Sequence, residues 1–581
     1  MDRFAERTGR RYHTVDYAGH PDAERVVVAM GSSTETLRAT VDHLAGAGER
    51  VGVVTVRLYR PFPTAALLAA VPASARRVAV LDRTKEPGSL GEPLFLDVLG
   101  ALAEAVARGE RAPLPLVVGG RYGLSSKELT PAMAAAVLAE LDRPEPKRRF
   151  TVGIDDDVSG TSIDVDPTFS IEAPGTVRAL FFGLGSDGTV GANKNTIKIL
   201  GDKGRYAQGD FVYDSKKSGS ETVSHLRFGP SPIHAPYLVD QASFVGCHQL
   251  GLLERRDILR FAAPGATLLV NAPYPADELF DRLPRPVQAQ LLDKHLVVHA
   301  IDAGRIARQA GLGGRVNTIL QTCFFALSGV LDEHEAVAEV KRAVEATYGR
   351  RGRRVVEANL AAVDQALAGL QRVELPDAVT SSVELRPPVP DGAPAFVRHV
   401  TAALLAGRGD DLPVSALPVD GTWPSGTAAY EKRSISELVA AWDPDLCIQC
   451  GNCSFVCPHS VLRAKLYDAA ALAGAPAGFA SAPLSARGLP ATAYTLQVYA
   501  EDCTGCALCV EACPVRSPNE PGRKAINLAP RPPAPDTVRH QVAFFEGLPT
   551  PERSSVDFGT VRGTQFLTPL FEFSGACEGC G

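Results

Sequence analysis

The spacing of its cysteines constrains this chain more than any other feature. The run C-x2-C-x2-C-x3-C-P occurs twice, over Cys447–Pro458 and over Cys503–Pro514. Three thiolates on one tight loop can cap three irons of a cubane, whereas the fourth cysteine is displaced and ligates the cluster of the other run. The spacing therefore predicts two [4Fe–4S] clusters that exchange one ligand.

This exchange assigns the metal ligands. We expect the first cluster to be bound by Cys447, Cys450, Cys453 and Cys513. We expect the second to be bound by Cys503, Cys506, Cys509 and Cys457. The small residues Gly451, Gly505 and Ala507 let backbone N–H groups approach the sulfurs, which raises the reduction potential. A pair of zinc sites is the alternative, since zinc also takes four thiolates; two intact runs ending in Cys-Pro favour iron and sulfide.

The other cysteines have different settings. Cys577 and Cys580 form a C-x-x-C pair, which alone indicates either a redox dithiol or half of a metal site, because two ligands cannot hold a cubane. Cys247 and Cys323 stand among apolar neighbours, so we predict that both are buried structural residues. His248, beside Cys247, is predicted to pack or cap rather than to bind a metal.

Composition excludes several classes of protein. The formal net charge is −6, too small to indicate a nucleic-acid partner, and 45% hydrophobic against 22% charged residues exclude wholesale disorder. No run of about 18 apolar residues occurs, and residues 1–7 lack the apolar core of a secretory signal. Grouped cysteines are also unlike a secreted disulfide framework. We therefore expect a cytoplasmic metalloprotein that binds neither membrane nor nucleic acid.

At about 150 residues per domain, 581 residues predict about four domains. The first, 1–145, alternates apolar runs with helical patterns and is predicted to be an α/β domain on a largely parallel sheet. Its strands are expected at Arg25–Met30, Val51–Leu58, Arg77–Leu81 and Leu114–Val118. Its helices are expected at Thr34–Ala45, Thr64–Ala70, Pro93–Arg108 and Pro131–Leu141. A polar linker is expected at Glu145–Arg149.

A second α/β region is predicted over 150–372, followed by a proline-rich linker over 373–395. Its strands are expected at Val177–Phe182, Phe211–Tyr213, Thr267–Asn271 and Leu296–Ile301, and its helices at Asn195–Leu200, Asn317–Gly329 and Glu335–Thr347. A small unit over 396–440 precedes the cysteine-rich region.

A glycine-rich turn follows the first strand of this second region. Gly183–Gly188 reads G-x-G-x-x-G between an apolar strand and a helix, which favours a phosphate at the helix N-terminus; the alternative is a merely tight strand–helix turn. The next strand ends in Asp214–Lys217, where an adenosine ribose would lie. Its two lysines suit a phosphorylated ribose, as in NADP or coenzyme A, although a solvated lysine pair would read the same.

These motifs together resemble a known family. Gly183–Asn195, Tyr213–Gly219, Tyr430–Arg433, the two cysteine runs and Phe573–Cys577 stand in one order. The series is similar to pyruvate:ferredoxin (flavodoxin) oxidoreductase, the single-chain thiamine diphosphate enzyme. The resemblance implies an α/β multidomain protein with a transketolase C-terminal-like domain (1–145), a Rossmann-like coenzyme A domain (150–372), an EKR domain (396–440), a two-cluster bacterial-ferredoxin domain (441–530) and a connecting segment (531–565).

The resemblance also implies an activity. The family converts pyruvate and coenzyme A to acetyl-CoA and CO2, and passes electrons through [4Fe–4S] clusters to ferredoxin or flavodoxin; the complete enzyme is expected to be a homodimer. It assigns no catalytic residue to this chain. Coenzyme A contacts carry over to Phe181, Phe182, Gly183, Leu184, Gly185, Lys216, Asn317 and Asn359. Asn317 could equally cap its helix.

The departures from the family bear on what the chain does alone. The family's N-terminal and C-terminal domains together bind thiamine diphosphate and Mg2+, and the chain has no Gly-Asp-Gly motif of the C-terminal one. Residues 566–581 resemble the start of that domain, and Cys577 and Cys580 resemble two ligands of a third cluster. We therefore expect a fragment that is inactive alone; the alternative is an electron-transfer subunit of a split 2-oxoacid:ferredoxin oxidoreductase.

Overall fold

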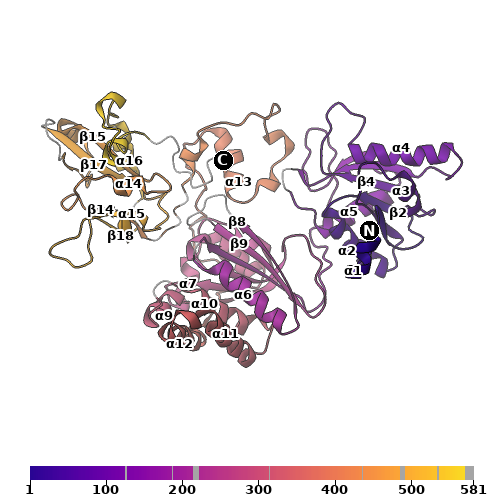
Figure 1. Ribbon diagram of the computed structural model, residues 1–581, viewed down its shortest axis with the longest axis horizontal. Coiled ribbons are helices and arrows are strands. Elements are labelled where there is room, and N and C mark those ends of the chain that lie inside the picture. The colour runs from indigo at the N-terminus through magenta and orange to yellow at the C-terminus, as the bar shows by residue number, and fades with distance from the viewer. Residues whose placement is uncertain are drawn as a thin grey trace.

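The computed structural model describes residues 1–124, 127–185, 187–213, 221–312, 315–432, 434, 436, 438–484, 491–532 and 535–568. Two sheet domains, a small helical unit and a cysteine-rich unit follow one another along the chain, and the helical unit lies among the other three (Figure 1). Among the described residues, no helix is long and apolar enough to cross a membrane.

The first domain is built on a six-stranded sheet of order β1-β3-β2-β4-β5-β6. β1 pairs antiparallel with β3, and the other pairs are parallel. The strands are β1 Val15–Gly19, β2 Arg25–Ala29, β3 Val51–Val56, β4 Arg77–Asp82, β5 Leu116–Arg121 and β6 Arg149–Thr151. The helices are α1 Asp2–Thr8, α2 Ser33–Gly46, α3 Thr64–Ala70, α4 Pro93–Ala107 and α5 Pro131–Asp142.

Alternating side chains of these strands enter two cores. Val27 and Val53 pack under α2 and α5, whereas Val28 and Val54 pack under α3 and α4. A sheet buried on both faces needs such continuous valine-rich strands. The predicted strands and helices of this domain agree with the structure. β1 and β6 were missed, and the polar linker expected at Glu145–Arg149 ends in β6, which extends the sheet past residue 145.

The second domain contains a seven-stranded mixed sheet of order β13-β12-β11-β10-β7-β9-β8. Its strands are β7 Val177–Leu184, β8 Tyr206–Tyr213, β9 Glu221–Gly229, β10 Ala242–Cys247, β11 Ala262–Asn271, β12 Val297–Ile301 and β13 Gln371–Val373. Its helices are α6 Thr189–Asp202, α7 Ala276–Arg282, α8 Arg285–Asp293, α9 Ala303–Gln309, α10 Asn317–Ser328, α11 Glu333–Tyr348 and α12 Arg353–Gly369, with the short turns η2 Leu250–Leu252, η3 Ile258–Phe261 and η4 Gly349–Arg351.

Strand β9 corrects the Rossmann-like expectation. In that fold the strand after the first crossover helix would adjoin β7, but β8 forms a hairpin with β9, and β9 lies antiparallel between β7 and β8. β7 and β8 therefore run in the same direction with one strand between them. Their carboxyl ends still share one edge of the sheet, because Leu184 and Tyr213 pair with the neighbouring residues Glu221 and Thr222.

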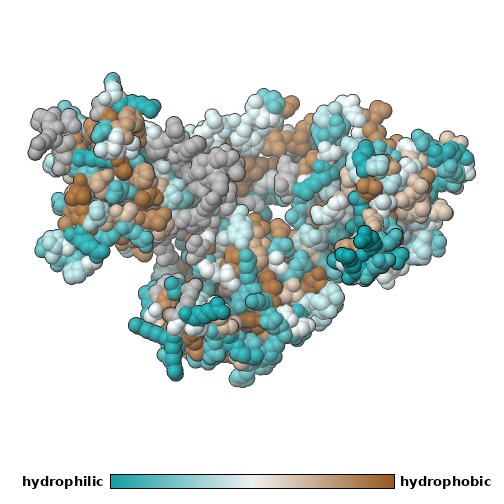
Figure 2. All heavy atoms as spheres, in the orientation of Figure 1, coloured by the Kyte–Doolittle hydropathy of each residue, from teal (hydrophilic) through white to brown (hydrophobic). Residues whose placement is uncertain are grey.

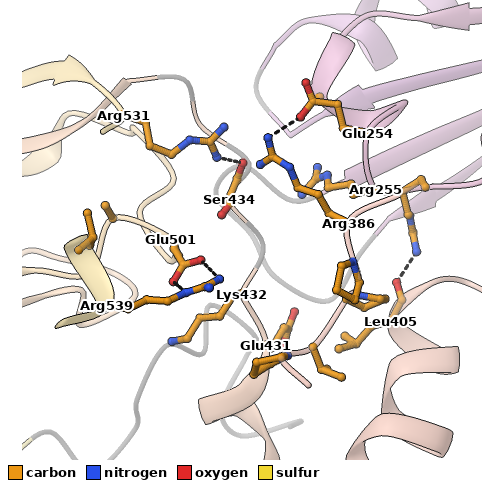
Figure 3. A pocket seen from close by; sticks show the side chains of 18 of the residues that line it. Glu254, Arg255, Arg386, Leu405, Glu431, Lys432, Ser434, Glu501, Arg531 and Arg539 are labelled. Atoms are coloured by element: carbon orange, nitrogen blue, oxygen red, sulfur yellow. Dashed lines mark hydrogen bonds and ion pairs between the residues drawn. The ribbon is translucent and has the colours of Figure 1, made fainter. Parts of the chain in front are cut away.

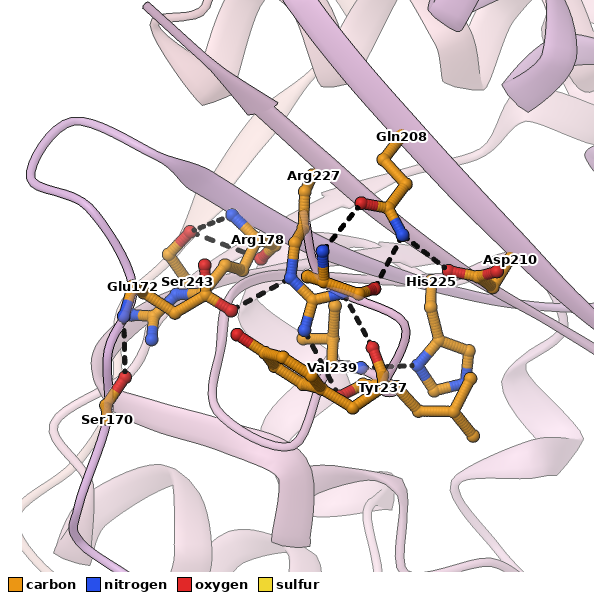
Figure 4. Close-up of polar contacts among 12 residues, drawn as sticks. Ser170, Glu172, Arg178, Gln208, Asp210, His225, Arg227, Tyr237, Val239 and Ser243 are labelled. Atoms are coloured by element: carbon orange, nitrogen blue, oxygen red, sulfur yellow. Dashed lines mark hydrogen bonds and ion pairs between the residues drawn. The ribbon is translucent and has the colours of Figure 1, made fainter. Parts of the chain in front are cut away.

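A buried arginine anchors β9 to the loops around it (Figure 4). Arg227 is 1% exposed, and its Nε donates to a Glu172 carboxylate oxygen at 2.8 Å. Its terminal nitrogens donate to the carbonyls of Tyr237 (2.9 Å) and Leu238 (3.2 Å). A buried guanidinium is tolerable only when paired and hydrogen-bonded in this way. The network fixes the 170–172 and 237–239 segments against the sheet.

The small helical unit binds all three neighbours. It contains η5 Val397–Thr401, α13 Ala402–Leu405, η6 Gly409–Asp411, η7 Val414–Ala416 and η8 Thr427–Tyr430. Val414 N donates to Asp155 O of the first domain at 2.9 Å. Arg260 donates to the Gly407 carbonyl at 2.8 Å from the second domain. The expected 373–395 linker also packs on the second domain, where Arg386 N donates to Glu254 O at 2.8 Å.

The cysteine-rich unit holds two small antiparallel sheets, β14-β18 and β15-β17-β16. Its strands are β14 Leu438–Trp442, β15 Leu462–Asp468, β16 Ala482–Pro483, β17 Thr492–Val498 and β18 Ile526–Pro530. Its helices are α14 Asn452–Phe455, η9 Ala469–Gly474, α15 Leu508–Ala512, α16 Pro535–Gly547, η10 Arg553–Ser555 and α17 Val561–Thr564. Apolar atoms gather on the visible surface of this unit (Figure 2), and Ile448, Phe455 and Leu508 are exposed near its cysteine loops.

Candidate functional site

The first cysteine cavity lies between the β14-β18 sheet and strand β17. It is lined by Cys447, Cys450, Cys453 and Cys513, together with Trp442, Tyr494, Val515 and Ile526. Three of these cysteines come from the first run and the fourth from the second. The structure thus brings together the four residues predicted to ligate the first cluster.

The second cavity repeats the arrangement with the runs exchanged. It is lined by Cys503, Cys506, Cys509 and Cys457, together with Pro458, His459, Leu462 and Leu528. The short helices α14 and α15 pack against each other, which places the two cavities side by side within one unit. Among the described residues, no group of three or more His, Cys, Asp or Glu side chains is arranged to hold a single metal ion.

The two loops share an unusual backbone conformation. Gln449 and Gly451 in the first loop have φ of 58° and 80°, and Gly505 and Ala507 at the matching positions of the second have φ of 66° and 63°. Left-handed residues within a tight loop turn successive N–H groups to one side and form a concave anion site. Two of the four are not glycine, and each such residue costs about 1–2 kcal/mol. A repeated strained conformation is typical of a loop that encloses a bound group.

Electrostatics at these thiols fits a cationic metal core. Burial, and then the charges of Cys447 and Cys450, raise the pKa of Cys453 to about 12. Burial, and then the charges of Cys457 and Cys503, raise the pKa of Cys509 to about 12. Four thiolates around an apolar cavity repel one another unless cations lie between them. Each donor set therefore fits an iron–sulfur cubane.

Backbone amides also point at the sulfurs. Gln449 N donates to Cys447 Sγ at 3.3 Å. Burial raises the pKa of the Cys503 thiol, and hydrogen bonding to the backbone of Ala440 and Gly505 opposes that rise. Such hydrogen bonds stabilise the more negative, reduced state of a cluster. The predicted approach of N–H groups at the small residues is thus present at Gly505, whereas Gln449 and Ala440 were not predicted to contribute.

The glycine-rich turn after β7 is partly explained by packing. A Cβ at Gly183 would lie 2.8 Å from Thr189 Cβ, so glycine there lets the strand and α6 approach each other. Gly188 has φ of 90°, and a Cβ there would lie 3.0 Å from Asn317 Cβ. The turn therefore places Asn317, at the start of α10, beside the N-terminus of α6.

A carboxylate already occupies part of this helix N-terminus. Asp187 Oδ1 accepts from Thr189 N at 2.8 Å, and Asp187 Oδ2 accepts from Leu184 N at 2.7 Å. A bound phosphate at these amides would meet the Asp187 charge, so the structure does not offer the phosphate cradle expected from the motif. The second glycine, Gly185, remains at the carboxyl edge of the sheet, where backbone can meet a ligand.

Three of the other predicted coenzyme A residues are buried. Phe181 and Phe182 are buried in the cores on opposite faces of β7. Asn359 is buried, accepts from Thr318 Oγ1 at 3.2 Å and donates to Val355 O at 2.8 Å. The predicted residues Lys216, Cys577 and Cys580 lie outside the described residues.

The predictions for the isolated cysteines are confirmed. Cys247 and Cys323 are both 0% exposed in the second domain. His248 is buried, with its Nδ1 2.7 Å from Thr189 Oγ1, and burial lowers its pKa to about 4. It therefore packs as a neutral ring behind the glycine-rich turn.

A charged cavity that sequence reasoning did not predict lies between units (Figure 3). Its volume is about 680 Å3, and it lies where the second domain, the helical unit and the cysteine-rich unit meet. Around its wall, Arg386 pairs with Glu254 at 2.9 Å and Arg539 pairs with Glu501 at 2.8 Å. Glu431 and Lys432 of the Tyr-Glu-Lys-Arg motif also line it. Its residues come from segments more than 200 positions apart, so only the tertiary structure assembles it.

Two α/β sheet domains joined to a pair of four-cysteine cavities define the class of a multidomain iron–sulfur oxidoreductase. Comparison with known families agrees. Residues 178–369 match "Pyruvate ferredoxin/flavodoxin oxidoreductase", residues 23–121 "Pyruvate:ferredoxin oxidoreductase core domain II", residues 446–517 "4Fe-4S dicluster domain", and residues 382–436 the EKR family, "Domain of unknown function". The chain belongs to the pyruvate:ferredoxin/flavodoxin oxidoreductase family, and the dicluster match favours iron–sulfur clusters over zinc.

Named relatives cover the whole chain. It is 54% identical to the pyruvate-flavodoxin oxidoreductase of Rhodospirillum rubrum, with 100% of this chain and 49% of that protein aligned. It is 52% identical to a putative pyruvate-flavodoxin oxidoreductase of Synechocystis sp. (100% and 48%) and 46% identical to the pyruvate:ferredoxin oxidoreductase of Moorella thermoacetica (100% and 49%). The chain thus spans about half the length of the curated relatives it matches.

Proposed function

We propose that this chain supplies the coenzyme-A-contacting and electron-transfer parts of an enzyme that converts pyruvate and coenzyme A to acetyl-CoA and CO2. The observation that carries the proposal is the exchange of one cysteine between the two cavities. Two adjacent cubanes suit a reaction that releases two electrons, because a cluster of this kind carries one electron at a time. Ferredoxin or flavodoxin is the proposed acceptor.

Within the cysteine-rich unit, the protein residues hold and screen the clusters. Cys447, Cys450, Cys453 and Cys513 would bind the first, and Cys503, Cys506, Cys509 and Cys457 the second. Trp442 and Tyr494 cover the first cavity with aromatic rings, 5.7 Å apart between centroids, which limits the access of water. The exposed apolar side chains Ile448, Phe455 and Leu508 leave the cluster loops accessible to an electron acceptor.

In the second domain, we propose that coenzyme A lies at the carboxyl edge of β7. Gly183 and Leu184 end this strand, Gly185 follows them, and Asn317 lies beside Gly188 at the start of α6. Because Asp187 occupies the α6 amides, the contact would be made through the pantetheine part, with the phosphorylated end nearer Lys216. Calorimetric titration of the chain with coenzyme A tests this. Asn317→Ala should weaken binding about tenfold, the loss of one buried hydrogen bond, and exposed Asn519→Ala should leave it unchanged.

The proposed activity is tested by comparing this chain with a longer form that spans the relatives' full length. Cluster-reconstituted chain should not reduce viologen dye with pyruvate, coenzyme A and thiamine diphosphate, because no described residue is assigned to the thiamine chemistry. A longer form spanning the relatives' full length should reduce the dye in the presence of all three. Pyruvate-dependent dye reduction by this chain alone would contradict the proposal, as would a full-length form that is inactive although fully loaded.

A further inference from the structure

The end of the helical unit lies along the second cysteine loop. Ser434 N donates to Glu501 O at 2.8 Å, two residues before Cys503. A Cβ at Gly505 would lie 2.7 Å from Leu438 O, so the loop and this segment are in close contact. Ala440 then lines the second cavity together with Cys503. The described residues 432, 434, 436 and 438–440 thus lie along the second loop, from the lysine of the Tyr-Glu-Lys-Arg motif to the cavity.

An ion pair marks the centre of this contact. Lys432 Nζ lies 2.8 Å from Asp502 Oδ2, and the Asp502 side chain is 4% exposed. A buried carboxylate requires a partner, because an uncompensated buried charge costs several kcal/mol. Asp502 directly precedes the ligand Cys503 in the chain. Because the two residues are adjacent, the carboxylate lies within the range of a Coulomb interaction with a cluster bound at Cys503.

The first loop has no charged residue at the matching position. The residue that precedes Cys447, at the position matching Asp502, is Leu446. The two cavities thus have the same kind of ligands and the same loop conformation. A carboxylate also contacts the first loop, since Asp443 accepts from Leu446 N at 3.4 Å, but it is 15% exposed and pairs with the exposed Arg523. Asp502 is more deeply buried, at 4%, and pairs with a lysine from another unit. A charge in a medium of low dielectric constant changes the free energy of adding an electron nearby. The ion pair can therefore act on one cluster and spare the other.

We propose that Lys432 is a positioning residue for the second cluster, which holds Asp502 against the Cys503 loop and offsets its charge, and so sets that cluster's reduction potential. This assigns a role to a unit whose family is described as a domain of unknown function. The proposal rests on the proposed function in one respect, that the second cavity holds a [4Fe–4S] cluster. It does not depend on pyruvate or on coenzyme A.

The test is a redox titration of the reconstituted chain, monitored by EPR. The EPR signals are assigned with Cys513→Ser, which should lack the first cluster, and Cys457→Ser, which should lack the second. Lys432→Gln leaves the Asp502 anion beside the cluster and should lower the second potential. Asp502→Asn removes the anion and should raise it. Each shift should change the sharing of an electron between the clusters about tenfold, which is 59 mV for a one-electron couple. Lys432→Arg should restore most of the native value.

Control measurements distinguish an electrostatic shift of the potential from a loss of local structure. The first cluster is an internal control and should not move. Arg523→Gln breaks a pair with Asp443, 2.6 Å apart, whose arginine is 45% exposed, and should have little effect because exposed pairs are screened. Should Lys432→Gln lose the second cluster while Lys432→Arg keeps it, the positioning role stands and Asp502→Asn decides the electrostatic one.

The proposal is overturned if Lys432→Gln and Asp502→Asn shift the second potential in the same direction, if both clusters move equally, or if neither variant has an effect. A wild-type chain that forms no second cluster would instead refute the proposed function of that cavity. Iron content distinguishes the two failures, since in the first case the wild-type chain still binds both clusters.

Discussion

The two cysteine loops have the same spacing and the same left-handed positions, yet they are held by different surroundings. The first contacts aromatic residues and α17: Tyr494 lines its cavity, and Arg562 Nη2 donates to Gln449 Oε1 at 3.2 Å. The second contacts Lys432 and Ser434 at the end of the helical unit. Two clusters with identical ligands can thus have different reduction potentials, because burial, charge and hydrogen bonds to the sulfurs set a cluster's potential.

The largest expected effect concerns the exchanged ligands. Cys513 is part of the second run, but Cys513→Ser should abolish the first cluster. Cys457 is part of the first run, but Cys457→Ser should abolish the second cluster. Each variant should retain about four of about eight irons per chain, because each cubane holds four. Iron and sulfide analysis with EPR measures this. Cys323→Ala, at a buried position in α10, is the control and should keep all the iron.

The next effect compares one left-handed glycine from each loop. Gly505→Ala places a Cβ 2.7 Å from a backbone carbonyl at φ of 66°, whereas Gly451→Ala places one 3.1 Å from Arg562 Cα at φ of 80°. Both variants place a non-glycine residue at positive φ, which costs about 1–2 kcal/mol of stability. Gly505→Ala also adds a clash with backbone. The second cluster of Gly505→Ala should be lost at lower temperature than the first cluster of Gly451→Ala. Thermal bleaching of cluster absorbance measures both, and the reverse order would contradict the comparison.

A smaller effect is expected where α17 covers the first loop. Gln449 is buried and donates to Pro483 O at 2.8 Å as well as accepting from Arg562. Arg562→Ala removes one of these anchors, worth about 1–2 kcal/mol. The first cluster should then bleach faster in air, and the second should not. Equal acceleration of both would show that the two surroundings are not independent.

The smallest effect is a relief of strain. Ala507 has φ of 63° without being glycine, so Ala507→Gly removes a left-handed penalty but adds chain entropy to the unfolded state. The net gain in unfolding free energy should be about 0.5 kcal/mol, restricted to the second loop. Chemical denaturation of the apo chain detects it. A loss of stability would indicate that the Ala507 methyl group makes packing contacts that outweigh the strain.

Sequence reasoning succeeded where short-range patterns decide the structure. In the first domain, valine-rich runs and helical periodicity located β2–β5 and α2–α5, because each element buries its own face. The grouping of the cysteines followed from loop geometry alone. In contrast, β9 has nearly every side chain buried, so its sequence shows no alternation that marks a strand. Its insertion beside β7 is a property of the whole sheet.

The contacts that distinguish the two loops could not be predicted either. Lys432 and Asp502 are 70 positions apart, and neither has a local pattern that indicates a buried ion pair. The carboxylate of Asp187 at the α6 N-terminus is a further example, since G-x-G-x-x-G alone favours a phosphate there. Side chains that fill a site from elsewhere in the chain become visible only when the chain is folded.

The most direct test of the account is anomalous diffraction at the iron edge from crystals of the anaerobically reconstituted chain. We expect two iron sites, one bound by Cys447, Cys450, Cys453 and Cys513, and one bound by Cys503, Cys506, Cys509 and Cys457. Two cubanes with one ligand exchanged would confirm the central claim. Iron sites bound by the four cysteines of a single run, or a single site in the unit, would contradict it.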